Sequence, residues 1–156
     1  MDMSTPNTAA QPQGIALVEQ WLELARGGQW SLPQLMEAAS RLQQAGAAEA
    51  AAVLYQTWVT ATASPLRHVA CFNWGSILGE LRRHADAETV YRLALAQAPQ
   101  FAQARLNLGH QLEHLGREEE ALTEWRTVYE NENPEGLGTD ALSLRRHALN
   151  NAARLL

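Results

Sequence analysis

The first regular pattern along the chain is helical and begins at Ile15. Ile15, Val18, Leu22 and Ala25 fall on one face of a helix, and Gly27-Gly28 follows directly after it. Residues 1–14 are polar and include prolines without periodicity, so they have little apolar surface to offset the entropy lost on ordering. The pattern therefore predicts a disordered tail over residues 1–14 and a packing helix over residues 15–31.

The rest of the chain repeats itself with a period of 34 residues. Residues 68–101 align with residues 102–135 without a gap, and Asn73-Trp74-Gly75 in the first copy matches Asn107-Leu108-Gly109 in the second. A divergent copy precedes them, and Ala148–Leu156 restarts the first helix of another. We therefore expect helix pairs in residues 32–67, 68–101 and 102–134, and then a loop and an incomplete repeat in residues 135–156.

Side-chain size recurs together with the hydrophobic pattern. A small residue in the first helix would let that helix approach the second helix closely, and a small residue in the second helix would leave room for the contact. A large aromatic side chain in the second helix would fill the space against the next copy. The three sets are Ala39, Gly75, Gly109 and Ala153; Ala51, Ala87 and Ala121; and Tyr55, Tyr91 and Trp125. This pattern is typical of stacked helical hairpins.

The turn between the two helices of a pair favours a residue with positive φ. Gly46 and Gly116 occupy this position in two copies, and Arg82 occupies it in the copy between them. A non-glycine residue in a left-handed conformation costs about 1 kcal/mol, so we expect Arg82→Gly to stabilise the fold.

Trp58 is a second departure from the repeat. It stands where the next two copies have Ala94 and Val128. Such a bulky side chain would either splay the first helix pair or pack against the N-terminal helix around Trp21 and Trp30. We favour packing against the N-terminal helix.

Composition and charge narrow the classes of partner. The formal net charge of -5 is made of both signs, and all twelve cations are arginine, so neither nucleic acid nor an acidic membrane is an expected partner. The absence of lysine indicates a GC-rich bacterial coding bias. The chain is long enough for one domain with a continuous core.

The sequence contains no signal for export or for a membrane. The N-terminus lacks a basic and apolar leader, and no apolar run approaches the roughly 20 residues of a spanning helix. The single cysteine, Cys71, cannot form an internal disulfide and falls on an inner helix position. We expect a cytoplasmic protein.

The repeat in residues 68–134 resembles the tetratricopeptide repeat. About ten constrained positions recur at fixed spacing, which makes the resemblance specific. It implies an all-α fold, a right-handed superhelix of helix-turn-helix repeats, whose usual role is to bind another polypeptide.

A narrower resemblance covers most of the region from Leu54 to Leu156. The runs Phe72–Gly75, Gln103–His110 and His147–Leu156 are similar to the repeat region of bacterial SPINDLY-type proteins, which are relatives of O-linked N-acetylglucosamine transferase. In that family the repeats precede a glycosyltransferase domain, which would lie after residue 156. The resemblance implies that these repeats present an acceptor protein to a catalytic domain.

The candidate binding residues lie on the first helices, which line the concave wall of such a superhelix. Asn73, Asn107 and Asn151 share one repeat position, and their carboxamides could hydrogen-bond a peptide backbone, as a similar asparagine ladder does in the transferase family. Helix packing is the alternative role for these asparagines. Neighbouring positions would add side-chain contacts: Phe72, Ser76, Glu80, Leu106, His110, Glu113 and His114.

Other kinds of site have little support. His110 and His114 are four residues apart with Glu113 beside them, but two histidines without a third ligand at useful spacing are weak evidence for a metal. A carboxylate clamp like that of heat-shock chaperone adaptors would need a basic wall, whereas this wall carries Glu80 and Glu113. We expect no cofactor, no metal and no catalytic residue in this chain.

Two functional hypotheses follow from the sequence. The first is a peptide-binding scaffold that presents substrate in a SPINDLY-like protein glycosyltransferase. The second is a free-standing adaptor or assembly scaffold, whose C-terminal helix caps the superhelix or docks onto a second copy through an apolar face. That face comprises Ala148, Leu149, Ala152, Leu155 and Leu156.

Overall fold

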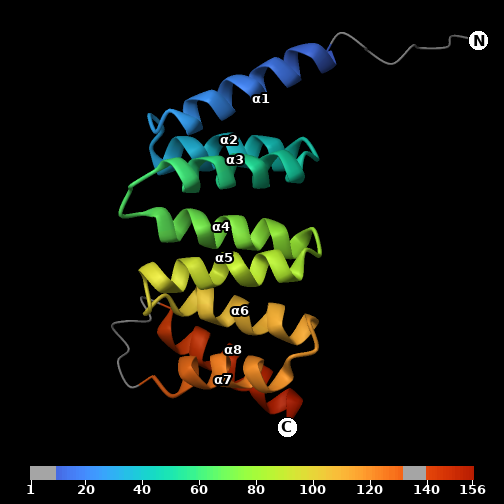
Figure 1. Cartoon of the computed structure of the whole chain (residues 1–156). Helices are drawn as coiled ribbons and strands as arrows, with labels where there is room; N and C mark the ends of the chain where they lie inside the picture. The colour runs from blue at the N-terminus through green and yellow to red at the C-terminus, as the bar shows by residue number, and fades with distance from the viewer. Residues whose placement is uncertain (1–9, 132–139) are drawn as a thin grey trace, which may run out of the picture. The chain divides into compact units, whose positions relative to one another are not determined.

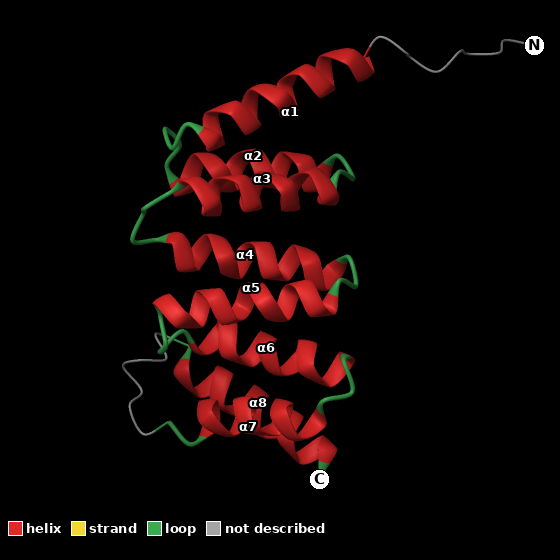
Figure 2. Ribbon diagram, viewed as in Figure 1, coloured by secondary structure: helices red, strands yellow, loops and turns green. Residues whose placement is uncertain are grey.

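The protein is helical throughout the described residues. The computed structural model describes residues 10–131 and 140–156, which form helices and loops without a strand (Figure 1, Figure 2). The helices are α1 (Ala10–Arg26), α2 (Leu32–Gln44), α3 (Ala48–Ala61), α4 (Arg67–Glu80), α5 (His84–Gln97), α6 (Ala102–His114), α7 (Glu118–Tyr129) and α8 (Ala141–Leu155). The expected all-α fold class is therefore confirmed.

The first helix begins earlier than the apolar pattern suggested. α1 starts at Ala10 rather than Ile15, with Pro12 in its first turn, where a missing backbone N–H costs no helical hydrogen bond. The remainder of the expected tail, residues 1–9, lies outside the described residues, as do residues 132–139 of the expected loop before the incomplete repeat.

The chain divides into two compact units after Thr62, whereas the sequence suggested one continuous core. Unit 1 is Met1–Thr62 and unit 2 is Ala63–Leu156. The boundary falls at the connection between α3 and α4, which contains Pro65. Proline is unfavourable inside a helix, so Pro65 keeps α3 and α4 from joining into one continuous helix.

In unit 1, α3 packs against both α1 and α2. The expected small and large residues meet at the centre of this unit, where Ala39, Ala51 and Tyr55 are buried. At the edge of the unit, the Arg41 guanidinium lies 5.1 Å from the centroid of the Trp21 ring, a cation–π contact between α2 and α1.

Trp58 belongs to the core of unit 1. Its side chain is buried, and its indole N–H donates a hydrogen bond to the Trp30 carbonyl at 2.9 Å. Trp30 in turn lies beside Trp21, with ring centroids 6.4 Å apart. The expectation that Trp58 packs toward the tryptophans of the N-terminal segment is confirmed.

In unit 2, each helix packs against the next from α4 to α8. A Cβ added at Gly75 would lie 2.9 Å from Tyr91 Cζ, and one added at Gly109 would lie 2.7 Å from Trp125 Cδ1. The first helix therefore approaches the second closely at Gly75 and Gly109, as expected, but the rings of Tyr91 and Trp125 rest on these glycines of their own helix pair, whereas they were expected to face the next copy. Ala153, the residue of α8 at the equivalent repeat position, is exposed.

The three turns inside the helix pairs share one geometry. Gly46, Arg82 and Gly116 have φ of 77°, 59° and 75°. The next backbone N–H bonds back to the preceding helix in each case, as in Arg83 N–H to the Leu78 carbonyl at 2.9 Å and Arg117 N–H to the Leu112 carbonyl at 2.9 Å. Arg82 therefore holds a left-handed conformation where its counterparts are glycine, which confirms the repeat register.

No helix of the described chain is long and apolar enough to cross a membrane.

Candidate functional site

The sequence-predicted binding residues gather on one side of unit 2. The first helices of its repeats, α4, α6 and α8, contact one another in that order. We call their outward side the first-helix face. Its polar residues, all half-buried or exposed, are Asn73, Ser76 and Glu80 on α4; Asn107, His110, Glu113 and His114 on α6; and Asn151 and Arg154 on α8.

Two of the three asparagines already serve the packing of the helices. The Asn107 amide donates a hydrogen bond to the Tyr91 hydroxyl at 3.1 Å, which joins α6 to α5. The Asn151 amide lies 3.3 Å from His110 Nε2 and joins α8 to α6. Because each carboxamide has a second N–H and a carbonyl oxygen, these bonds leave part of the donor and acceptor capacity for a ligand.

The Tyr91 hydroxyl connects two of the expected site residues. It bonds the side chains of both Asn107 and Ser76. Burial of the ring raises the pKa of Tyr91, and the bonds to Asn107 and Ser76 act in the opposite direction. Tyr91 therefore stays neutral and fixes the position of two polar side chains, one from α4 and one from α6.

An ion pair on the first-helix face links α6 to α8. Arg154 donates to both oxygens of Glu113, at 2.6 and 2.9 Å, and these bonds hold the pKa of the Glu113 carboxyl below its usual value. Sequence reasoning did not select Arg154. The same repeat position holds Ser76 and His110 in the other copies. Comparison of the copies therefore gives no indication that Arg154 would pair with Glu113.

His110 is neutral in this arrangement. An amide nitrogen can only donate, so the Asn151 bond requires a lone pair on His110 Nε2. Burial is the main cause that lowers the pKa of His110, Arg154, His114 and His147 act in the same direction, and Glu113 opposes them. The ring also meets the edge of Trp125, with centroids 5.4 Å apart.

A second pair of histidines lies where α4, α5 and α6 meet. The His84 and His114 rings stack with centroids 4.4 Å apart and planes 13° apart. His84 Nδ1 donates to the carboxamide oxygen of Gln111 at 2.8 Å, and the Gln111 side chain lies over Gly79. The predicted site residue His114 is therefore supported by His84 and Gln111, which the sequence analysis did not select.

An aromatic cluster lies near the start of α4 and α6. Phe72 lies 5.0 Å from Phe101 and 6.1 Å from Tyr91 between ring centroids, and His68 meets Phe101 edge-on at 5.6 Å. Phe72, Phe101 and His68 are all half-buried. Together they form an apolar patch with exposed ring surface, of which the sequence analysis named only Phe72.

Leu106 differs from the expectation that it lines a binding surface. It occupies the repeat position of Phe72 but is only 8% exposed, and its carbonyl accepts the Trp125 indole N–H at 3.1 Å. Its side chain therefore serves the core of unit 2 more than a contact surface.

The described residues contain no candidate metal site and no reactive cysteine. None of their histidine, cysteine and acidic side chains form a group of three that could hold a metal ion. The Cys71 side chain is buried, and burial raises the pKa of its thiol, which disfavours the reactive thiolate. The site is therefore a face of neutral polar, ionic and aromatic groups.

The geometry defines a protein of stacked helical hairpins, and the comparisons with known proteins agree. The solved structure "Crystal structure of MamA", of a protein that contains tetratricopeptide repeats, is similar with a TM-score of 0.58 and 13% sequence identity, over 99% of this chain and 94% of that one. At this identity the similarity shows the fold alone.

No family model and no curated protein matches the sequence. The narrower resemblance to SPINDLY-type proteins therefore has no support from these comparisons.

Proposed function

We propose that this protein is an interaction scaffold that binds an extended segment of another polypeptide across the first-helix face of unit 2. The observation that carries this proposal is the row of polar side chains at equivalent positions on three contacting helices. An extended peptide presents a backbone N–H and C=O at regular intervals, which a regular row of carboxamides can bind with little regard to sequence.

The face is preorganised for such a ligand. Asn107 is held by Tyr91, Asn151 by its contact with His110, and Glu113 by Arg154. Ordering these side chains therefore costs little when a ligand binds, and the aromatic patch around Phe72 offers an anchor for an apolar residue of the ligand.

A peptide library displayed on phage, selected against the whole chain, would test this proposal. Asn73→Ala should weaken the selected peptides about tenfold, the loss expected when an interface residue worth more than 1 kcal/mol is truncated. Asn73 is the cleanest position, because Asn107→Ala also removes a packing bond to Tyr91. Thr123→Ala, on the exposed side of α7, is the matched control.

Peptides that bind wild type, Asn73→Ala and Thr123→Ala equally would place binding elsewhere on the chain. So would a selection that enriches no peptide.

The wider context of the scaffold has two candidate forms. In the first, it presents substrate to a SPINDLY-like protein glycosyltransferase, as the resemblance implies. In the second, it is a free-standing adaptor. An immunoblot of the native source distinguishes them: a species much larger than the 17.2 kDa of this chain favours the first, and one of this size favours the second. For the residues described here we propose binding and no catalysis.

A further inference from the structure

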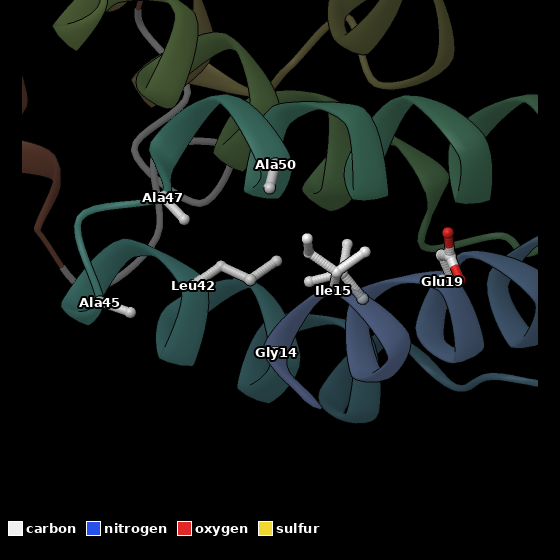
Figure 3. A pocket seen from close by; sticks show the side chains of 8 residues that line it. Gly14, Ile15, Glu19, Leu42, Ala45, Ala47 and Ala50 are labelled. Carbon is white, nitrogen blue, oxygen red and sulfur yellow. The ribbon is translucent and has the colours of Figure 1, made fainter. Parts of the chain in front are cut away.

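Unit 1 contains an apolar cavity that the binding face of unit 2 does not involve. It lies between the first half of α1, the end of α2 and the start of α3, and has a volume of about 630 Å³. Ile15 and Val18 of α1, Leu42 of α2 and Ala47 and Ala50 of α3 line it, and Figure 3 shows Ile15 and Leu42 directed toward one another. The cavity is open to solvent and large enough to receive aliphatic side chains of another chain.

The cavity exists because α1 runs obliquely to the other two helices of its unit. In Figure 1, α1 moves away from α2 and α3 toward its own start. The residues of α3 that line the space between them, Ala47 and Ala50, have small side chains. Ile15 is 62% exposed as a result. Ile15 and the apolar lining of the cavity together form a contiguous apolar surface that is a candidate for docking.

One charge lies at the rim of the cavity. Among the described residues that line the cavity, Glu19 alone is charged, and it lies one helical turn after Ile15. It is exposed and forms no ion pair with any described residue. A ligand that matches this site would place an apolar side chain against Ile15 and a basic side chain one turn away, against Glu19.

The outer face of α8 in unit 2 has this chemistry and this spacing. Leu142, Arg146, Leu149 and Ala153 follow one another at intervals of three or four residues, so they form one stripe along the helix, and all are exposed. Leu142 is 83% and Leu149 is 53% exposed. The opposite side of α8 is buried through Leu144, Ala148 and Ala152.

The charge of α8 is complementary to the rim. The helix contains three arginines and no acidic residue. Arg145 donates to the Tyr129 carbonyl and Arg154 to Glu113, whereas Arg146 forms no ion pair with the described residues. Arg146 stands one turn from Leu142 and from Leu149, as Glu19 stands one turn from Ile15.

We infer that the α8 stripe of one copy docks into the unit 1 cavity of a second copy, with a leucine against Ile15 and Arg146 against Glu19. The two surfaces differ, so the contact is heterologous and leads to head-to-tail chains or rings. The inference is independent of the proposed peptide binding, which uses α4, α6 and the side of α8 that carries Asn151 and Arg154.

Sedimentation velocity at a series of protein concentrations would test this inference. The first step compares how the mass of wild type and of single variants depends on concentration. Wild type should increase in mass with concentration, and Leu149→Asp should need a concentration at least about tenfold higher to do so, since it loses apolar burial at the contact. Leu93→Asp, which alters another exposed leucine (42%) on α5, should behave as wild type.

Mixing two blocked variants is the decisive step. Leu149→Asp keeps the cavity and Ala50→Arg keeps the stripe. At a concentration at which neither variant associates alone but wild type does, their mixture should therefore give a species of two chains that grows no further. Arg146→Glu and Glu19→Arg, both at exposed positions, should each weaken association, and the chain that carries both changes should recover it.

Four outcomes would overturn the inference: a wild type that is monomeric at every concentration, a mixture that stays monomeric, failure of the charge reversal to recover association, or normal association of Ala50→Arg. The last would mean that the α8 stripes pair with each other and not with the cavity.

Discussion

The contact between Gly109 and Trp125 gives the sharpest prediction for stability. A Cβ at residue 109 would lie 2.7 Å from both Cδ1 and Cε2 of Trp125, whose side chain is fully buried and whose indole N–H donates to the Leu106 carbonyl at 3.1 Å. The ring cannot move away from the added methyl group without straining its neighbours or lengthening this bond. Gly109→Ala should therefore destabilise unit 2.

The expected loss of stability is the sum of two destabilising effects and one stabilising effect. Overpacking a core costs about 1–3 kcal/mol, and weakening one hydrogen bond costs about 1 kcal/mol more. Alanine is better than glycine in a helix interior by about 1 kcal/mol. The net loss should be about 1–3 kcal/mol, and each kcal/mol should lower the melting temperature of a unit of this size by about 4–8 °C.

Thermal and urea unfolding followed by circular dichroism would measure this loss. Gly14→Ala is the matched control, because nothing lies within 4 Å of a Cβ at that helical glycine, so the same change should be neutral or stabilising. Combining Gly109→Ala with Trp125→Leu should remove most of the penalty, since the clash needs the indole. An unchanged or higher midpoint for Gly109→Ala alone would refute the close approach of the ring.

Three further predictions concern single residues. Arg82→Gly should raise the urea midpoint by the equivalent of about 0.5–1 kcal/mol, because it relieves a φ of 59°; a lower midpoint would contradict the strain. Trp58→Phe should cost about 1 kcal/mol or more in urea unfolding through loss of the hydrogen bond to Trp30, and an unchanged midpoint would count against that bond. The pKa of His110 is lowered in the folded state, so the unfolded chain binds more protons there, and stability should be lost as pH falls from the usual histidine value through the folded pKa. Urea midpoints between about pH 5 and 8 should show a shallower pH dependence for His110→Gln than for wild type, and equal slopes would oppose this linkage.

The sequence predicted much of the fold because the constraints of a helical hairpin are local and periodic. A period of 34 residues predicts a close approach of the two helices at Gly75 and Gly109 and assigns Arg82 to a left-handed turn, although the rings that lie over these glycines were expected to face the next copy. Each of these contacts joins the two helices of one hairpin, or their turn. Hydrophobic spacing and side-chain size suffice to predict them.

The candidate site could be predicted only in part. The register placed Asn73, Asn107 and Asn151 on one face, but the sequence could not distinguish between binding and packing for these side chains. The structure assigns packing bonds to Asn107 and Asn151 through Tyr91 and His110. The bonded partner belongs to another helix in each case, so the distance depends on how neighbouring helices are rotated and spaced.

What the sequence by itself determined is the set of helices, their pairing into hairpins and the close contact inside each pair, since the residues that decide them recur at fixed intervals. Only the tertiary structure decided the division after Thr62, the burial of Leu106 and the pairing of Glu113 with Arg154, which are 41 residues apart. The division after Thr62 and the Glu113–Arg154 pair arise where one hairpin meets the next helix. There the connecting loop and the tilt of each helix, rather than the repeat period, set which side chains come within reach.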